Sequence, residues 1–79
     1  MQTIFIQVKC ELGKAYLVAD LAVAIEQISE VHSTSGKYDL LMKCYLPAGE
    51  DIGHFINESI QTIEGVRDTF TIITYKAFN

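Results

Sequence analysis

The residues best suited to chemistry lie in the middle of the chain, where a turn signal is followed by an aspartate and an apolar run. Gly36 permits the positive φ that tight turns often require, and Tyr38 and Asp39 follow it closely. A carboxylate that opens the apolar run 40–42 either accepts hydrogen bonds from backbone N–H groups or faces a polar ligand, because an unpaired buried carboxylate is costly. The residues alone leave both interpretations of Asp39 open.

Other reactive side chains are sparse. His32 and His54 are the two histidines, and neither has a partner at metal-ligand spacing. The serines lack a nucleophile elbow, and the glycines stand singly instead of forming a phosphate-binding loop. Cys10 and Cys44 have apolar neighbours and are predicted to be buried, unreactive thiols. We therefore predict no catalytic residue, no metal and no cofactor. Hydrogen-bonding groups with one or two carboxylates suit the binding of a small zwitterion.

Length and composition restrict the class of protein. A chain of 79 residues with 49% hydrophobic residues predicts a single folded domain over 1–79, and a domain this small gains from oligomerisation. The net charge of −4, without a run of basic residues, argues against nucleic acid as a direct partner. No signal segment is visible, and the apolar window 15–25 is short and interrupted by Asp20. We expect a cytoplasmic protein that does not bind membranes.

Hydrophobic periodicity predicts six elements that position these residues. Apolar residues alternate in the predicted strands and recur three and four residues apart in the predicted helices. Glu50 and Asp51 suit the start of the second helix, and Gly65 suits its end. The predicted elements are a strand over 3–10, a helix over 14–29, strands over 31–35 and 38–46, a helix over 49–65 and a strand over 66–78.

This order of elements predicts an α+β fold of the ferredoxin-like βαββαβ type. Its four-stranded sheet is antiparallel, and both helices lie on one face. Several of the strands carry apolar residues on both faces, whereas two helices can cover only one face. We therefore predict a dimer that forms through the sheets, as in dimeric α/β barrels.

Two stretches resemble a known family. Residues 35–41 resemble the Gly-x-Tyr-Asp motif of the effector domain of Lrp/AsnC (feast/famine) transcriptional regulators, often called the RAM domain. Residues 63–71 resemble the second signature of that domain, Gly-Val-x-x-Thr-x-Thr, which follows its second helix. The resemblance extends over nearly the whole chain, with the two motifs at the spacing that the family has.

The resemblance implies homodimers, often assembled into rings such as octamers, with an amino acid or related metabolite bound between dimers. It implies that Asp39 pairs with a ligand ammonium or orders the loop, and that backbone N–H groups near Gly36 hold a carboxylate. The implied ligand-binding residues are Thr34, Ser35, Gly36, Lys37, Tyr38, Asp39 and Leu40 from the hairpin and Thr69 and Thr71 from the last strand.

Full-length regulators of this family carry a helix-turn-helix DNA-binding domain ahead of the effector domain. Here Met1 is followed at once by a predicted strand, so we expect a stand-alone effector domain that senses an amino acid and modulates full-length regulators. Two alternatives stay open. One is a cofactor-independent enzyme of the dimeric α/β-barrel type, with His32 and Tyr75 as candidates. The other is an assembly partner that binds no ligand.

Overall fold

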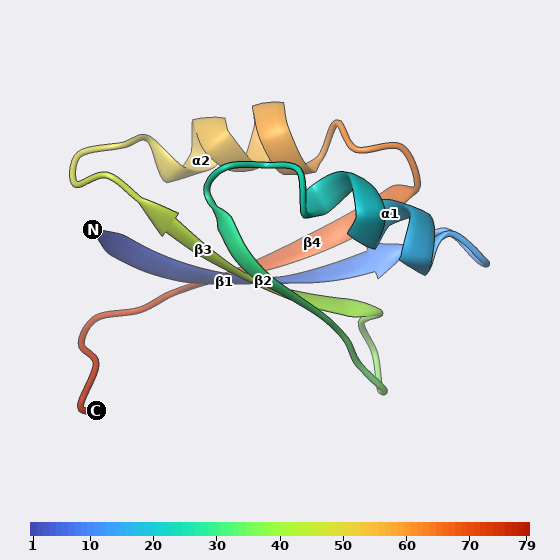
Figure 1. The fold of residues 1–79 in the computed structure, drawn as a ribbon, viewed down its shortest axis with the longest axis horizontal. Coiled ribbons are helices and arrows are strands. Elements are labelled where there is room, and N and C mark those ends of the chain that lie inside the picture. Colours follow the sequence, from blue (N-terminus) through green and yellow to red (C-terminus); the bar gives the residue numbers. More distant parts are fainter.

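The chain forms four strands and two helical segments in the predicted order (Figure 1). The computed structural model describes residues 1–79 throughout. The elements are β1 (Gln2–Cys10), α1 (Ala15–Ala22), β2 (Ile28–Ser33), β3 (Leu40–Leu46), α2 (Ile52–Phe55), the π-helical turn η1 (Ile56–Ile60) and β4 (Val66–Ile73). The sheet is antiparallel in the order β2-β3-β1-β4, and both helical segments lie on one of its faces. The predicted α+β, ferredoxin-like arrangement is therefore confirmed.

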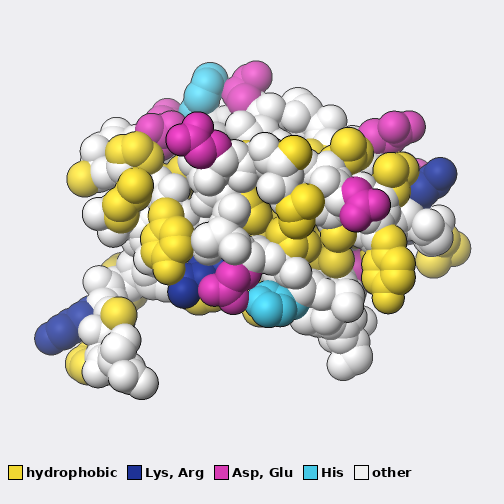
Figure 2. All heavy atoms as spheres, viewed as in Figure 1, with side chains coloured by type: hydrophobic (Ala, Val, Ile, Leu, Met, Phe, Trp, Pro, Cys, Tyr) yellow, Lys and Arg dark blue, Asp and Glu magenta, His cyan; other side chains and the backbone are white.

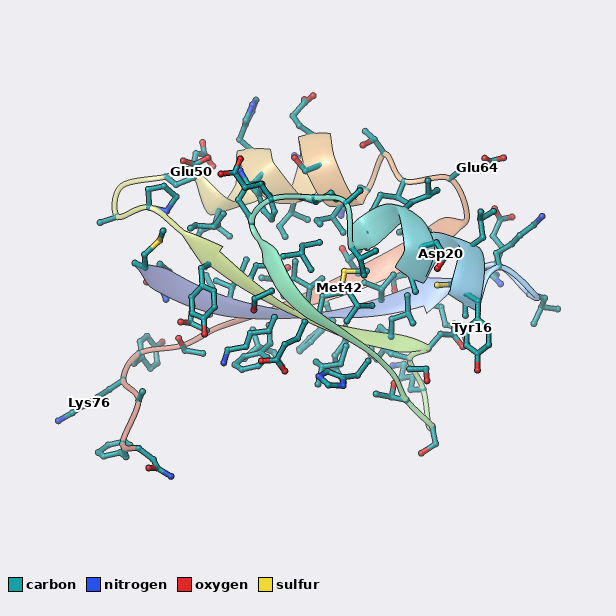
Figure 3. The ribbon with its side chains drawn as sticks, viewed as in Figure 1. Tyr16, Asp20, Met42, Glu50, Glu64 and Lys76 are labelled. Atoms are coloured by element: carbon teal, nitrogen blue, oxygen red, sulfur yellow. The ribbon has the colours of Figure 1, made fainter.

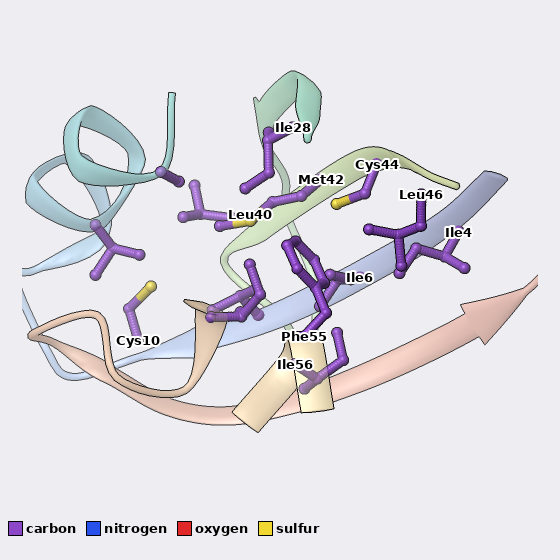
Figure 4. Close-up of a cluster of buried hydrophobic side chains, with 14 residues drawn as sticks. Ile4, Ile6, Cys10, Ile28, Leu40, Met42, Cys44, Leu46, Phe55 and Ile56 are labelled. Carbon is purple, nitrogen blue, oxygen red and sulfur yellow. The ribbon is translucent and has the colours of Figure 1, made fainter. Parts of the chain in front are cut away.

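The hydrophobic core lies between the sheet and the helices (Figure 4). Ile4 and Ile6 of β1 are fully buried, and they pair with Cys44 and Met42 of β3. Residues directly opposite each other in an antiparallel pair share a face, so every second position of both strands points into this core. The other buried members are Val8, Cys10, Val18, Ala22, Ile28, Leu40, Leu46, Phe55, Ile56 and Ile60. Two layers of one small chain thus close this face of the sheet.

The first helix is shorter than the prediction, because α1 ends at Ala22 and not near Ser29. Beyond it, the N–H of Ile25 donates to the carbonyl of Ala22, and the N–H of Ile28 donates to the carbonyl of Ile25. These three-residue turns keep Ile25 and Ile28 on the core side, so the apolar spacing continues after the helix has ended. The pattern that predicted a long helix was therefore correct about the burial of Val18, Ala22 and Ile28. It was wrong about the conformation after Ala22, and Leu21 of the same pattern is 43% exposed.

The second helical segment changes its winding halfway. Asp51 caps α2, because its Oδ1 accepts the N–H of His54 at 2.9 Å, which confirms that acidic residues start this helix. The chain then continues as η1, where the N–H of Gln61 donates to the carbonyl of Ile56. The wider turn brings residues five apart onto one side, so Phe55 and Ile60 are both buried.

Gly65 lies in the turn that precedes β4, beyond the end of the helical segment, which closes at Ile60 and not at Gly65 as predicted. Its φ of 96° is the left-handed conformation that glycine favours. A Cβ atom at this position would lie 2.9 Å from Cγ2 of Val18 in α1. Glycine therefore serves both the turn and the close packing of this turn against α1.

Strand ends also differ from the prediction. β2 runs from Ile28 to Ser33, and β3 begins at Leu40, because Asp39 still belongs to the connecting loop. β4 ends at Ile73 instead of Phe78. Ile73 pairs with Ile4 near the start of β1, so residues after Thr74 have no partner strand, and the tail leaves the sheet (Figure 1).

The surface over the helices is acidic and polar. Figure 2 shows acidic side chains gathered along this side of the molecule, and Figure 3 labels Asp20, Glu50 and Glu64 among them. None of the helices has the length and apolar character needed to cross a membrane. Apolar side chains are also exposed on this side, since Tyr16 is 76% and Val23 is 63% exposed in and directly after α1.

The opposite face of the sheet has no covering element within the chain. Figure 3 shows side chains projecting from it, away from Met42, which lies between the layers. Phe5 pairs with Ile72 and Gln7 with Phe70 on this face, and Phe70 is 53% exposed. We call this surface the open face; its apolar members are Phe5, Leu41, Tyr45, Phe70 and Ile72.

Candidate functional site

The loop between β2 and β3 holds the residues that the sequence singled out. Gly36 has a φ of 95°, as its predicted role in a turn requires. The loop is closed at its base, where the N–H of Thr34 donates to the carbonyl of Asp39 at 2.9 Å, and Oγ1 of Thr34 donates to the carbonyl of Tyr38 at 3.1 Å. These bonds hold the exposed tip, residues 35–37, at the end of the sheet.

Asp39 fastens this loop to β1. Its Oδ2 accepts the N–H of Cys10 at 2.8 Å, and its own N–H donates to the carbonyl of Val8 at 2.9 Å. Nζ of Lys9 lies 3.9 Å from the same oxygen. The second oxygen, Oδ1, has no hydrogen-bond partner within the chain, and the carboxylate is partly exposed. Asp39 therefore satisfies a backbone donor as one interpretation predicted, and it keeps one oxygen free; its contact with a ligand stays a prediction.

A hollow of about 460 Å³ opens beside this loop. Its size falls within the range of about 300–1,000 Å³ that small-molecule sites occupy. The Tyr38 ring forms part of its wall and lies against Phe70 of the open face, with the ring centroids 6.2 Å apart. The lining residues are Lys9, Gly36, Lys37, Tyr38, Arg67 and Asp68. The hollow thus joins the loop to β1 and β4 and carries charges of both signs.

An irregularity in the sheet shapes one wall of the hollow. Lys9 pairs with Asp68, but the next residue, Cys10, pairs with Val66, so Arg67 is an extra residue in β4. Regular alternation would send Arg67 and Asp68 to opposite faces. The bulge instead lets both of them line the same hollow.

The structure brings together only some of the nine predicted residues. Gly36, Lys37 and Tyr38 line the hollow, whereas Leu40 is in the core at 1% exposure. Thr69 and Thr71 pair with Val8 and Ile6, so they lie on the helix side of β4. Thr34, Ser35 and Asp39 belong to the same loop without lining the hollow.

Thr69 already has a partner, because its Oγ1 accepts Nε2 of Gln61 at 2.9 Å. The loop and the two threonines therefore lie on different sides of the sheet within one chain. A single ligand can touch both sets only where a neighbouring subunit supplies one of them. Their shared role in ligand binding stays a prediction.

Sequence reasoning missed Lys9, Arg67 and Asp68. Strand alternation together with the pairing of β1 and β4 would have placed Lys9 beside Asp68. Arg67 had no comparable signal, because its position depends on the bulge, and the bulge depends on how two distant strands meet. The motif that drew attention to residues 63–71 emphasised the threonines and not the two charged residues that precede them.

A second polar group lies on the open face. Nε2 of His32 lies 2.9 Å from Oε1 of Glu30, and Nζ of Lys43 lies 3.6 Å from Oε2 of the same carboxylate. The hydrogen bond from His32 lowers the pKa of Glu30 below its ordinary value. Lys43 also lies over the ring of Tyr45, 5.3 Å from its centroid. These charges border the apolar members of the open face.

Other candidate residues are not gathered into a reactive site. Tyr75 lies fully exposed on the tail. His32 is hydrogen-bonded to Glu30 instead. No cluster of three His, Cys, Asp or Glu side chains could hold a metal ion. Cys10 and Cys44 are free and buried as predicted, and burial raises the pKa of the Cys44 thiol to about 11. His54 is exposed on α2, and its side chain has no partner within the chain.

Comparisons with known proteins agree with this geometry. Residues 3–79 match the family model described as the Lrp/AsnC ligand binding domain. The HTH-type transcriptional regulator FL11 of Pyrococcus furiosus is 36% identical over 72 residues, which make up 91% of this chain and 47% of that protein. The chain thus spans about half the length of the curated relatives it matches.

Solved structures share the fold. The crystal structure of FFRP-DM1 superposes with a TM-score of 0.88 at 29% identity and covers 95% of this chain and 100% of that chain. A transcriptional regulator from Neisseria meningitidis, solved in complex with L-Met, has a TM-score of 0.87 at 18% identity and covers 99% of this chain and 52% of that chain. At that identity the second likeness concerns the fold alone. The matching model describes a ligand-binding domain and the curated relatives are named transcriptional regulators, in agreement with the prediction that the chain is not an enzyme.

Proposed function

Because the chain belongs to the family of Lrp/AsnC ligand-binding domains, we propose that it binds an amino acid or a closely related metabolite in the hollow beside the β2–β3 loop. Binding there would control a transcriptional regulator, acting in the cytoplasm. The observation that carries this proposal is the hollow of about 460 Å³, which offers cationic and anionic groups beside an aromatic wall. A zwitterion needs both signs of charge, and the aromatic ring supplies apolar contact.

The loop supplies groups for both ends of an amino acid. Oδ1 of Asp39 has no partner within the chain and can accept a ligand ammonium while Oδ2 continues to hold the N–H of Cys10. Lys37 and the backbone around Gly36 face the hollow and can hold a carboxylate. A ligand would therefore tie the loop to β1 and β4 and order the tip of the loop.

The open face supports assembly as a homodimer through the sheets. Phe70, Ile72 and Tyr45 are 53%, 40% and 38% exposed, and all three lie on the same face of one sheet. The chain exposes 5354 Å², whereas a folded monomer of 8.8 kDa is expected to expose about 4,800 Å². A second copy on the open face would bury this surplus apolar surface, and a ring of such dimers would place one subunit beside the hollow of another.

A screen of the amino acids by thermal shift, with the size of the assembly measured by sedimentation, tests the proposal. We expect at least one amino acid to raise the unfolding midpoint in proportion to the logarithm of its concentration, because a ligand that binds only the native state stabilises it. A dimer or larger ring is expected at micromolar concentration. A chain that assembles but binds no amino acid would instead be an assembly partner, and a compact monomer would contradict the assembly.

The chain itself is proposed not to bind duplex DNA. It carries a net charge of −4, and none of its elements forms a helix-turn-helix. Control of transcription would be exerted through a DNA-binding partner such as a full-length regulator. A gel shift with the purified chain at physiological salt should show no complex; a shift that weakens as salt rises would contradict this part of the proposal.

A further inference from the structure

We propose that the hollow beside the β2–β3 loop selects a ligand with a second acidic group, such as an acidic amino acid, over a neutral amino acid. This inference rests on the function proposed above and adds the charge of the ligand. It is carried by the distribution of cations over the chain, by the partners that those cations lack, and by the bulge in β4.

Cations are concentrated at the hollow. The chain has six Lys and Arg residues against ten Asp and Glu residues, yet three of those six cations line this one hollow. Asp68 is the one carboxylate among the lining residues. Even when Asp39, which belongs to the loop but does not line the hollow, is counted, the cations exceed the carboxylates by one. An acidic chain therefore contains one concave, positively charged region that attracts anions.

Two of these cations have no ionic partner. The ion pairs of the chain join Lys9 to Asp39 and join His32 and Lys43 to Glu30. Lys37 and Arg67 take part in none of them. The Lys9 pair is long, at 3.9 Å, and its carboxylate is already hydrogen-bonded to a backbone N–H. The donors of the hollow are therefore available to a ligand.

The bulge in β4 places the cation best suited to a carboxylate. Arg67 is the extra residue opposite the Lys9–Cys10 step, and it lines the hollow next to Asp68. A guanidinium presents two parallel N–H donors that match both oxygens of a carboxylate. Bulges often redirect a side chain beside a binding site. Here the redirected side chain adds a positive charge where regular alternation would have removed it.

A neutral amino acid would leave this charge uncompensated. Its ammonium can meet Asp68 or the free oxygen of Asp39, and its carboxylate can meet Lys37 and the loop backbone. Arg67, which has no ionic partner within the chain, would then remain without a counter-charge in a site from which the ligand has displaced water. A second carboxylate on the ligand would give Arg67 a bidentate partner, and charge-assisted pairs of this kind are about twice as strong as neutral hydrogen bonds.

Matched ligand pairs test this inference by calorimetric titration. L-glutamate is compared with L-glutamine and L-aspartate with L-asparagine, because each pair differs in charge and hardly in shape. We expect the better acid to bind at least about tenfold more tightly than its amide. Equal affinity of an acid and its amide would overturn the inference and leave the proposed amino-acid binding intact.

Two further probes separate the sources of negative charge. Glutarate has both carboxylates but no ammonium, and inorganic phosphate is an anion without a carbon chain. We expect both to bind more weakly than the acidic amino acid, because neither can engage a carboxylate of the protein. If either binds as tightly as L-glutamate, the preference for anions holds and the proposed amino-acid function falls.

Variants then place the site. Arg67→Gln is expected to weaken binding of the acid about tenfold while changing binding of its amide by less than about threefold, because only the second carboxylate loses its partner. Lys37→Gln at the exposed loop tip is a second variant that does not depend on the integrity of β4. Lys76→Gln on the tail is the matched control and should bind like the unchanged chain. Lys37→Gln removes a partner of the carboxylate that both ligands share, so it should weaken the acid and its amide alike. Equal loss of acid and amide binding in Arg67→Gln would overturn the assignment of Arg67 to the second acidic group.

Discussion

The two faces of the sheet use the same strands in different ways. On the helix side, Ile4, Ile6 and Met42 are completely buried, and the chain supplies every atom that covers them. On the open face, Phe5 and Ile72 pair with each other, and Ile72 remains 40% exposed. The comparison shows that one chain completes its own core but leaves a second apolar surface for another molecule. Folding and assembly are thus assigned to opposite faces.

The hollow lies beside the β2–β3 loop, next to the open face of the sheet. Its wall contains Tyr38, which contacts Phe70 of the open face, and its loop is held by Asp39 to the backbone of β1. A ligand at this position would touch both the folded core strand and the surface proposed to meet a neighbour. The site therefore combines a rigid base with a border that assembly can change.

The largest expected effect comes from the buried face. Ile6→Ala should lower the free energy of unfolding by about 2–5 kcal/mol, because it leaves a cavity in a fully buried position. Ile72→Ala on the neighbouring strand is the matched control and should change the stability of the isolated chain much less. Urea unfolding followed by circular dichroism measures both. Equal losses at low protein concentration, where the chain is monomeric, would contradict the division between the two faces.

The next effect concerns assembly. Ile72→Lys places a charge at the proposed interface, and symmetry places it there twice, so the dimer should weaken about a hundredfold or more. The fold should survive, because a lysine at a position 40% exposed in the single chain can reach water. Sedimentation measures the assembly, and Ile72→Leu serves as the control of similar volume. An assembly that withstands Ile72→Lys would place the interface elsewhere.

A smaller effect tests the border between the faces. Asp39→Asn retains an oxygen that can accept the N–H of Cys10, so the free energy of unfolding should fall by about 1 kcal/mol or less. The amide cannot compensate a ligand ammonium, so binding of the best amino acid should weaken about tenfold. Calorimetric titration of both proteins decides the matter. Unchanged affinity with reduced stability would restrict Asp39 to its role in holding the loop.

The smallest effect is a pH dependence on the open face. The hydrogen bond from His32 lowers the pKa of Glu30 from its ordinary value of 4.5 in the folded chain. Stability from this group is therefore fully present above pH 4.5 and is lost as the pH falls through the lowered pKa. Acid unfolding curves of the wild type and Glu30→Gln should differ above this range and converge below it. Parallel curves across the range would show that the hydrogen bond contributes nothing.

Hydrophobic periodicity predicted most of the fold, because the burial of one face of each element imposes that periodicity on the sequence. Alternation in β1 and β3 fixed which residues face the core, and a shift of one residue would have exposed all of them. The end of α1 could not be predicted, because Ile25 and Ile28 keep a helical spacing through successive turns. The π-helical turn of η1 likewise leaves no signal in the spacing, since Ile56 and Ile60 suit either winding.

The site was predictable only in its local part. Gly36 indicates the loop because turns favour glycine, and Asp39 indicates it because a carboxylate is unexpected before an apolar strand. In the structure Gly36 has a positive φ, and Asp39 accepts a hydrogen bond from the backbone of β1. Lys9, Arg67 and Asp68 come from strands at the two ends of the chain. Their meeting depends on a register and a bulge, which are properties of the paired strands and not of either segment. The part of the site that depends on the pairing of distant strands could therefore not be predicted from the sequence.

The two buried cysteines give the chain internal reporters of its own opening. Thiol reagents attack the thiolate, and burial raises the pKa of both Cys10 and Cys44, so neither reacts while its surroundings stay closed. Cys44 lies in the middle of β3, whereas Cys10 lies at the end of β1, beside the bulge and under the Asp39 carboxylate. Labelling of Cys44 would therefore follow the rate of global unfolding, and labelling of Cys10 would follow the fraying of one strand end. A ligand that tightens the loop would slow the labelling of Cys10. The labelling of Cys44 would still depend on the stability of the whole domain.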